Sequence, residues 1–211
     1  SLRPLIPDPL VIDTFDGAAW IGITPFTMWG VRPAFLPPIP VLSESHELNV
    51  RTYVHLDGVP GIWFFSLDAS NPVAALGARL TFHLPYFHAR MSLERRNRTL
   101  RFVSRRTRLH AAPAGFEAVW TVGDRFPPSE PSSLRFFLTD RYALYSARRD
   151  ALYRARIFHR PWSLHEADLL SCRSTMLESQ GLPSTGEGDA PLLHRQGEPL
   201  KVRVWPRVRV R

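Results

Sequence analysis

Polar and apolar side chains alternate along the segment from His46 to Leu56. Successive side chains of a β-strand point to opposite faces of a sheet, so this pattern predicts a strand with one apolar and one polar face. The apolar face is expected to carry Leu48, Val50, Thr52 and Val54, and the polar face Glu47, Asn49, Arg51 and Tyr53. Asp57-Gly58 favours a hairpin turn into Gly61–Leu67, a second strand that is apolar on both faces and therefore predicted to be central in its sheet.

Strand-like patterns occupy most of the remaining chain, and turn-forming residues separate them. Strands are expected at Leu10–Asp13, Ala18–Met28, Phe87–Leu93, Thr99–Leu109, Phe116–Val122, Tyr142–Ser146, Ala151–Phe158 and Leu200–Val210. Two segments are expected to be loops, because Arg32–Pro40 is rich in proline and Gln180–Gly197 is rich in glycine, serine, proline and glutamate.

One long helix is predicted. It begins after Asn71, a suitable N-cap, and has Pro72 at its first position. Val73, Leu76 and Leu80 form an apolar stripe along it, and the helix is expected to pack on the sheet or plug one end of it.

A shorter helix is expected at Ser129–Leu138. Many strands and one principal helix indicate a closed or nearly closed antiparallel sheet. Neither an internal repeat nor a break in composition divides the chain, so one domain is expected over residues 1–211.

Composition narrows the class of protein. The chain has 211 residues, of which 44% are hydrophobic, and this is enough for a buried core. Its single cysteine, Cys172, excludes an intramolecular disulfide bond, and we expect a buried free thiol. The first residues do not resemble a signal peptide, and no apolar run approaches the roughly 18 residues that a membrane-spanning helix needs. A cytoplasmic location is therefore expected.

The formal net charge of +8 raises nucleic-acid binding as an alternative function. Of the 27 basic residues all but Lys201 are arginines, and they are spread along the predicted strands and loops. The densest groups, at residues 95–98 and 105–108, fall on a hairpin turn and on the exposed end of a strand. No helix-turn-helix, zinc-finger or RNA-recognition pattern accompanies them, so we interpret the arginines as solvated surface.

The polar face of the strand 46–56 is the first candidate for chemistry. Alternate positions of a strand lie about 6.5–7 Å apart, so Glu47, Asn49 and Arg51 form a row that offers a base, an amide and a guanidinium group. Such a row can hold a small carboxylate while the base acts on the adjacent carbon. The alternative is an ordinary solvent-exposed face with a Glu–Arg pair, and the alternation by itself favours this simpler interpretation.

A second cluster, His83, Tyr86 and His88, follows the predicted helix. Tyr86 can donate a proton or a hydrogen bond, or its ring can simply pack with the hydroxyl satisfied. The two histidines flank a proline and do not have a helical metal-binding spacing, and a core or rim position is the commoner case. Nucleotide-binding glycine loops, a nucleophile elbow and a His-Glu-x-x-His motif are absent, so neither a metal nor a cofactor is expected.

Three stretches in order resemble acetoacetate decarboxylases. Leu2–Asp13 is similar to a segment near the start of these enzymes, and Ser66–Arg79 is similar to the entry into their helix. His83–Phe87 falls where they carry the lysine that forms a Schiff base. Together the three stretches cover the first half of the chain.

This resemblance has two consequences for the site. Tyr86 and Phe87 stand where the decarboxylases have paired lysines, and neither side chain forms an imine. Lys201 is too remote in the sequence to take their place. Glu47 falls where the decarboxylases have an active-site glutamate, and the resemblance therefore favours a polar row that faces a pocket.

A second resemblance covers nearly the whole chain, to the YqjF-like family of bacterial proteins in the same superfamily. It is carried by Asp13–Gly17, Glu47–Val54, Trp63–Asp68, His88–Met91 and Val202–Pro206. It implies an α+β, mainly β fold: the curved antiparallel sheet or β-barrel of acetoacetate decarboxylases with one principal helix. It also implies that the family's N-terminal strand lies before residue 1.

These features predict a protein that binds a small anionic organic ligand in a barrel pocket and lacks Schiff-base decarboxylase activity. The candidate catalytic residues are Glu47 and Tyr86, and the candidate ligand-binding residues are Asn49, Arg51, Ser66, His83 and His88. One alternative is an acid–base enzyme without a covalent intermediate, such as a lyase, hydratase or isomerase acting on a keto or hydroxy acid. The other is a basic surface that binds nucleic acid. No membrane partner is expected, and a homo-oligomer stays open.

Overall fold

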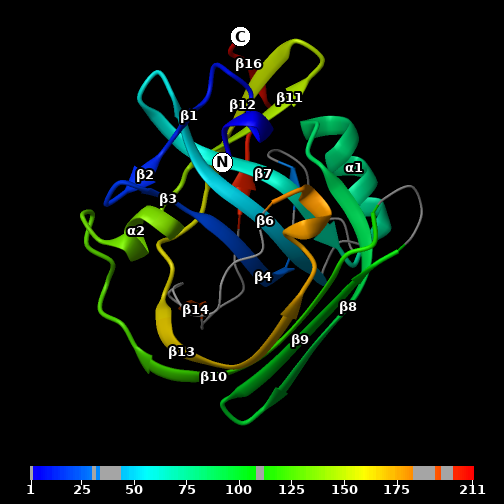
Figure 1. Ribbon diagram of the computed structural model, residues 1–211, viewed down its shortest axis with the longest axis vertical. Coiled ribbons are helices and arrows are strands. Elements are labelled where there is room, and N and C mark those ends of the chain that lie inside the picture. The colour runs from blue at the N-terminus through cyan, green and yellow to red at the C-terminus, as the bar shows by residue number, and fades with distance from the viewer. Residues whose placement is uncertain (1, 30–31, 34–43, 108–111, 183–192, 196–201) are drawn as a thin grey trace.

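The computed structural model describes residues 2–29, 32–33, 44–107, 112–182, 193–195 and 202–211 (Figure 1). Its strands are β1 (Val11–Ile12), β2 (Thr14–Phe15), β3 (Ala18–Ala19), β4 (Ile21–Trp29), β5 (Arg32–Pro33), β6 (Glu44–Leu56), β7 (Val59–Ala69), β8 (Tyr86–Arg96), β9 (Thr99–Arg106), β10 (Gly115–Arg125), β11 (Ala143–Arg148), β12 (Ala151–Phe158), β13 (Leu164–Ser174), β14 (Leu193–Arg195), β15 (Arg203–Val204) and β16 (Val208–Arg209). The helices are α1 (Pro72–Phe82) and α2 (Leu134–Thr139), with 3-10 turns η1 (Arg3–Leu5) and η3 (Glu178–Gln180). The predicted mainly β class with one principal helix is confirmed.

Fourteen of these strands form one curved sheet, whose main path runs β14–β13–β10–β9–β8–β7–β11–β12–β15–β5. In Figure 1, β8, β9, β10 and β13 sweep around the lower half of the molecule, while β4 and β6 cross above them. Most neighbours are antiparallel, but β7–β8, β7–β11 and β15–β5 are parallel. The expected curved, mainly antiparallel sheet is confirmed, although among the described strands its path stays open rather than closed and three of its pairings are parallel.

The sheet divides at β7. One edge of β7 pairs with β6 along most of its length. The other edge pairs with β11 only at Ile62 and Trp63, and with β8 only at residues 67–69. β8 and β11 therefore leave β7 in different directions, and α1, which connects β7 to β8, stands beside this fork (Figure 1).

A β-bulge in β7 determines which side chains share a face with those of β6. Val50 is paired with Ser66 but Arg51 is paired with Phe64, so Phe65 is the extra residue. Directly paired side chains of neighbouring strands point to the same face. Ser66 therefore lies on the face of Leu48 and Val50, and Phe64 lies on the face of Arg51.

The principal helix begins where the sequence predicts. The Asn71 side chain accepts hydrogen bonds from the backbone N–H groups of Val73 and Ala74, and Pro72 is the first helical residue. Its apolar stripe, however, does not pack on the sheet: Val73, Leu76 and Leu80 are 62, 58 and 67% exposed. The buried residue of the helix is Ala75, whose small side chain lets the helix backbone approach the sheet closely.

Several predicted boundaries need correction. The second helix is only Leu134–Thr139, capped by the Ser133 side chain, because the residues around Pro131 form turns. The C-terminal strand is interrupted at Trp205–Arg207 and so becomes β15 and β16, with Leu200 and Lys201 outside the described residues.

The two expected loops are only partly described. Arg32–Pro33 and Leu193–Arg195 form short strands, and most of the rest of both segments lies outside the described residues. Cys172 lies on β13 and is exposed, so the expected buried thiol is wrong. Within the described part of the chain, no helix is long and apolar enough to cross a membrane.

Replacing Gly61 with alanine is expected to lower the free energy of unfolding by about 1–3 kcal/mol, through overpacking. A Cβ at this position would lie 2.6 Å from Cε2 of Tyr145 and 2.9 Å from the carbonyl oxygen of Ala143, so β11 would have to move away from β7. Gly77 of α1 is the matched control, because a Cβ there meets nothing within 4 Å. Gly77→Ala is expected to stabilise by about 0.5–1 kcal/mol. Urea unfolding of both variants measures the difference, and equal effects would contradict the close approach of the two strands.

Candidate functional site

The polar row of β6 is buried. Glu47, Asn49 and Arg51 are only 2, 3 and 7% exposed, so the interpretation of this row as an ordinary solvent face is wrong. Leu48 and Val50 on the opposite face belong to the largest hydrophobic cluster of the described residues. β6 therefore has apolar core on one face and buried polar groups on the other.

Glu47 and Tyr86 meet on this polar face although they are 39 positions apart in the chain. The register of β6, β7 and β8 brings them together, because Leu67 of β7 is paired with both Asn49 and Tyr86. The Tyr86 hydroxyl donates to the Glu47 carboxylate, at 3.2 Å from Oε2 and 3.4 Å from Oε1. The two residues that the sequence indicated as catalytic thus form a contacting pair.

Burial changes the acid–base properties of both groups. It raises the pKa of Glu47 from 4.5 to about 8, and the hydrogen bond from Tyr86 opposes this only in part. Burial also raises the pKa of Tyr86 well above its ordinary value, and the neighbouring Glu47 adds to this increase. At neutral pH both side chains are therefore mainly protonated. Glu47 titrates close to the pH at which enzymes work.

Arg51 is held two residues beyond Asn49 on the same row. Its Nη2 donates to the carbonyl oxygen of Leu138 at 3.0 Å, and the Tyr53 hydroxyl donates to the same oxygen at 3.1 Å. The guanidinium also lies 5.7 Å from the ring centroid of Tyr53 and 5.9 Å from that of Trp162. These contacts fix its position and leave most of its N–H groups for other partners.

Two polar atoms of the row have no hydrogen-bond partner among the described residues: Oδ1 of Asn49 and Nε of Arg51, both buried. A buried polar atom without a partner costs about 1–3 kcal/mol, and water or a ligand usually satisfies such atoms. The row therefore has an unused acceptor two positions from Glu47 and an unused donor four positions from it, and such free polar atoms are what a polar ligand requires.

Ser66, a predicted ligand-binding residue, is not part of this row. It is fully buried but paired with Val50, so its side chain points to the opposite face of the sheet. The physical reason is the bulge at Phe65, which the sequence pattern does not reveal.

The opposite face contains a buried ion pair that sequence reasoning missed. Nη2 of Arg106 lies 2.7 Å from Oδ1 of Asp68, with side-chain exposures of 1% and 0%. The Arg106 guanidinium also stacks 4.0 Å from the ring centroid of Phe87. The interpretation of residues 105–108 as exposed surface is therefore wrong for Arg106, although it holds for Arg105. An aspartate within the apolar strand 61–69 was the available signal, since buried carboxylates need a cationic partner.

His83 lies apart from the Glu47–Tyr86 pair. It ends α1 in the left-handed conformation, with φ of 55°. Its Nε2 lies 3.2 Å from Nη1 of Arg148 and 3.0 Å from Nη2 of Arg207. The structure thus assigns His83 to an arginine-rich region beside α1.

His88 is two strands away from Glu47. It is paired with Ala69 of β7, which is paired with Glu47 of β6. Its Nδ1 lies 3.2 Å from the Thr107 hydroxyl, which also donates to the His88 carbonyl oxygen. His88 therefore lies on the same face as Glu47, with Ala69 between them. In the described part of the chain, no group of three or more His, Cys, Asp or Glu side chains is arranged to hold a metal ion.

Comparison with known proteins identifies the family. The model of the DUF2071 family, described as an uncharacterized conserved protein, matches residues 1–198. The chain belongs to this family. It is 41% identical over 205 residues to the uncharacterized protein YqjF of Bacillus subtilis (strain 168), covering 97% of this chain and 83% of YqjF. The YqjF-like membership that the sequence indicated is confirmed.

Solved structures of acetoacetate decarboxylases have a fold similar to that of this chain. The acetoacetate decarboxylase of Legionella pneumophila has a TM-score of 0.61 and 11% identity, covering 100% of this chain and 79% of the enzyme. A second acetoacetate decarboxylase has a TM-score of 0.62 and 16% identity, covering 99% and 81%. The enduracididine biosynthesis enzyme MppR complexed with pyruvate has a TM-score of 0.52 and 14% identity, covering 96% and 77%. At these identities the comparison shows a common fold, which confirms the predicted architecture.

Proposed function

We propose that the buried polar face of β6 binds a small keto or hydroxy acid, and that Glu47 and Tyr86 transfer a proton at it without a covalent intermediate. The observation that carries this proposal is the Glu47 carboxyl, which is buried in contact with the Tyr86 phenol, where burial raises its pKa to about 8. Ligand binding alone was the function expected from the sequence. The raised pKa of Glu47 favours the additional step, proton transfer to or from the bound ligand.

Glu47 is the proposed general acid–base group. A carboxyl with a pKa of about 8 is roughly one tenth ionised at pH 7, and its ionised form is a stronger base than an ordinary carboxylate. It can therefore take a proton from a carbon next to a carbonyl and return it elsewhere. Tyr86 stays neutral because its pKa is high, so its hydroxyl can stabilise an oxygen that gains negative charge.

Asn49 and Arg51 are the proposed binding residues. Four strand positions separate Glu47 from Arg51, about 13 Å between Cα atoms, and the long arginine side chain shortens the gap to a ligand. A ligand carboxylate on the guanidinium would satisfy the free Nε of Arg51, and a ligand hydroxyl would satisfy Oδ1 of Asn49. The keto-acid class is supported by the fold relative MppR, which was solved with pyruvate.

A covalent route is disfavoured by the residues at the Schiff-base positions. A lysine imine needs an amine, and Tyr86 and Phe87 occupy the two positions where the resembling decarboxylases have lysines. The single lysine, Lys201, lies outside the described residues. The proposal therefore uses proton transfer only.

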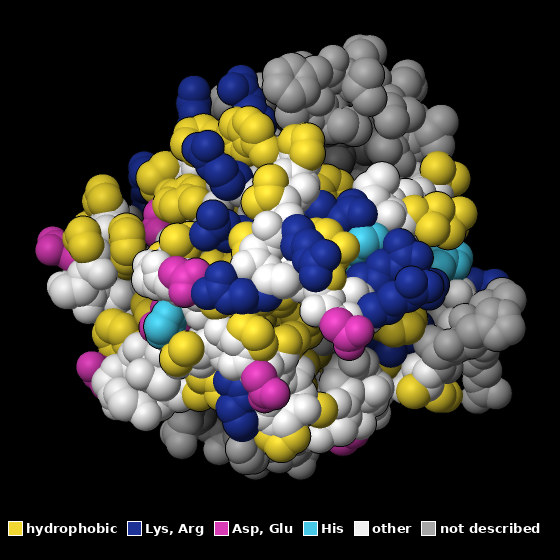
Figure 2. All heavy atoms as spheres, turned by 90° about the horizontal axis from the view of Figure 1, so that it is seen from above, with side chains coloured by type: hydrophobic (Ala, Val, Ile, Leu, Met, Phe, Trp, Pro, Cys, Tyr) yellow, Lys and Arg dark blue, Asp and Glu magenta, His cyan; other side chains and the backbone are white. Residues whose placement is uncertain are grey.

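Nucleic-acid binding is not favoured by the surface. Figure 2 shows the face at the top of Figure 1, where Lys and Arg side chains are interspersed with hydrophobic and acidic ones. Around the hairpin between β11 and β12, for example, Asp150 lies among Arg148, Arg149 and Arg209. A nucleic-acid surface needs a continuous basic stripe that follows the phosphates.

Proton exchange tests the proposed function. With small keto acids such as pyruvate in D₂O, the wild-type protein is expected to catalyse exchange of the protons next to the carbonyl, measured by ¹H NMR. Glu47→Gln is expected to slow the exchange by about 100-fold or more, since it removes the acid–base group but keeps the shape. Tyr86→Phe is expected to slow it by roughly 10-fold or more, because it removes one hydrogen-bond donor.

Two exposed residues of the same types provide matched controls, and Glu94→Gln and Tyr142→Phe are expected to leave the rate unchanged. The proposal fails if no keto acid of three to six carbons exchanges, or if Glu47→Gln exchanges at the wild-type rate. Borohydride trapping of a substrate on Lys201 would also overturn it, because that result requires an imine.

A further inference from the structure

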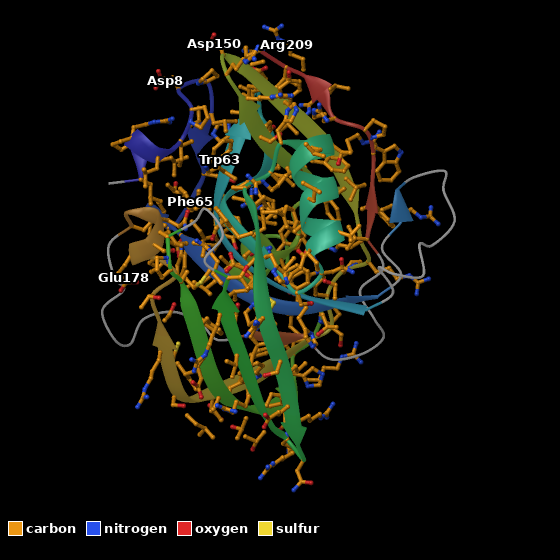
Figure 3. All side chains as sticks on the ribbon, turned by 90° about the vertical axis from the view of Figure 1, so that its right-hand side faces the viewer. Asp8, Trp63, Phe65, Asp150, Glu178 and Arg209 are labelled. Carbon is orange, nitrogen blue, oxygen red and sulfur yellow. The ribbon has the colours of Figure 1, made fainter. Side chains whose placement is uncertain are left out.

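A groove with a volume of about 610 Å³ opens between α1 and the fork of the sheet at β7. Its apolar lining includes Trp63 and Phe65 of β7, Leu80 of α1, and Leu84. Figure 3 shows Trp63 and Phe65 on β7, between α1 and the η3 turn that carries Glu178. Phe64 in its lining lies on the face of Arg51, but the lining includes none of the proposed catalytic and binding residues Glu47, Asn49, Arg51 and Tyr86.

The groove exists because β8 and β11 diverge from β7. Between Trp63, the last residue paired with β11, and Leu67, the first paired with β8, the outer edge of β7 has no neighbouring strand among the described residues. The bulge at Phe65 lies in this gap. α1 stands beside the gap, but its buried residue is the small Ala75, so the space beneath its C-terminal end is not filled. Cavities of 300–1,000 Å³ with a mostly apolar lining are typical of small-molecule sites.

The charged groups of the groove have one sign. Arg79 and Arg148 line it, and none of its lining residues is acidic. Neither arginine forms an ion pair with any residue in the described part of the chain. Two unpaired cations beside an apolar floor are complementary to an anion with an apolar body.

Two buried donors point to the same kind of ligand. Both neighbours of His83 Nε2 are arginine N–H groups, which only donate, so Nε2 accepts and Nδ1 carries the proton. This Nδ1–H is buried and has no acceptor among the described residues. The Ser146 hydroxyl, on β11 in the same lining, is also buried without a described partner. An incoming acceptor would satisfy both, and an anionic oxygen does so most strongly.

We propose that this groove binds an amphipathic carboxylate, such as a medium-chain fatty acid. The carboxylate lies at Arg148, with His83 and Ser146 as neutral donors, and the hydrocarbon lies along Trp63, Phe65 and Leu80. This second site is independent of the proposed reaction at Glu47. A single amphipathic carboxylate would explain the unpaired arginines, the unpaired donors and the apolar lining together.

Calorimetric titration with decanoate tests the ligand class. Decanol has the same hydrocarbon without the charge, and butyrate has the charge with a short hydrocarbon. Decanoate is expected to bind saturably, at least fivefold more tightly than either comparison ligand, because it alone uses both halves of the groove.

Two pairs of variants test the location. Arg148→Gln is expected to weaken decanoate binding by fivefold or more, whereas Arg90→Gln, the same change at an exposed position of β8, leaves it unchanged. Leu80→Ser is expected to weaken binding severalfold, whereas Leu76→Ser does not, since Leu76 is equally exposed on α1 but does not line the groove. Both positions of α1 are on the surface, so these variants keep the fold.

Three results would overturn the proposal. The first is equal affinity for decanoate and decanol, which removes the role of the arginines. The second is an Arg148→Gln variant that binds decanoate like the wild type. The third is a dimer in analytical ultracentrifugation that both Leu76→Ser and Leu80→Ser dissociate, because the exposed stripe of α1 would then be covered by a second copy of the chain.

Discussion

Replacing Arg106 with methionine is expected to lower the free energy of unfolding at pH 7 by about 3–5 kcal/mol, measured by urea unfolding. Asp68 is fully buried, and Arg106 is the partner that neutralises it, through a contact of 2.7 Å. Methionine keeps the apolar contact with Phe87 but leaves an uncompensated carboxylate in the core. Burial already raises the pKa of Asp68, and Arg106 opposes that increase. Without the arginine, the pKa rises further and the loss of stability is largest at high pH.

Arg101 provides a matched control for this prediction. It lies on the same strand and contacts Glu117 at 2.7 Å, but the two side chains are 43 and 34% exposed. Exposed pairs contribute about 0–1 kcal/mol, so Arg101→Met is expected to have a small effect. The double variant Arg106→Met with Asp68→Leu is expected to recover most of the stability, because no charge is then buried alone. An Arg106→Met variant as stable as Arg101→Met would contradict the buried pair.

The wild-type protein is expected to lose stability relative to Glu47→Gln as the pH rises from 5 to 8. Glu47 has a pKa of about 8 in the folded protein and 4.5 as its ordinary value. Between these two values the folded protein holds a proton that the unfolded chain has released, so raising the pH favours unfolding. Each tenfold change in proton affinity corresponds to about 1.4 kcal/mol. Relative to Glu47→Gln, the wild type is therefore expected to lose roughly 3–4 kcal/mol of its free energy of unfolding between pH 5 and pH 8.

Urea unfolding at several pH values measures this difference, with Glu94→Gln on the exposed part of β8 as the control. Glutamine is neutral at every pH and can still accept the hydrogen bond of Tyr86, so it isolates the charge. Parallel stability curves for the wild type and Glu47→Gln would mean that Glu47 titrates normally in the folded state.

The alternation in residues 46–56 identified the two faces of β6 but not their surroundings. A period of two says which side chains share a face, because it follows from strand geometry. It does not say what covers that face. The strands that bury Glu47 come from distant parts of the chain, and the contact with Tyr86 depends on the register of three strands. The resemblance to acetoacetate decarboxylases supplied that missing long-range information.

The errors at Ser66 and in α1 have different physical causes. A one-residue bulge moves side chains to the other face, and no local residue pattern in Gly61–Leu67 marks it. In α1, Val73, Leu76 and Leu80 do lie in a helix as the pattern predicted, but helical periodicity does not determine which side of the helix faces the sheet. Alanine on the other side allows a closer approach, and the larger residues stay outside.

The Asp68–Arg106 pair shows the limit of reasoning from composition. Arg106 stands in a run of arginines and is chemically identical to its exposed neighbour Arg105. Only the alternation along β9 separates them, since one points inward and the other outward. A charged residue inside an apolar strand is therefore the better guide, and Asp68 was such a residue.

The central claim is that Glu47 is a protonated acid at neutral pH within a ligand site. Its most direct test is a ¹³C NMR titration of the Glu47 side-chain carboxyl, assigned with Glu47→Gln, with and without pyruvate. We expect a midpoint near 8 in the free protein and a changed midpoint when pyruvate is bound. A midpoint near 4.5 that pyruvate leaves unchanged would contradict both the raised pKa and the site.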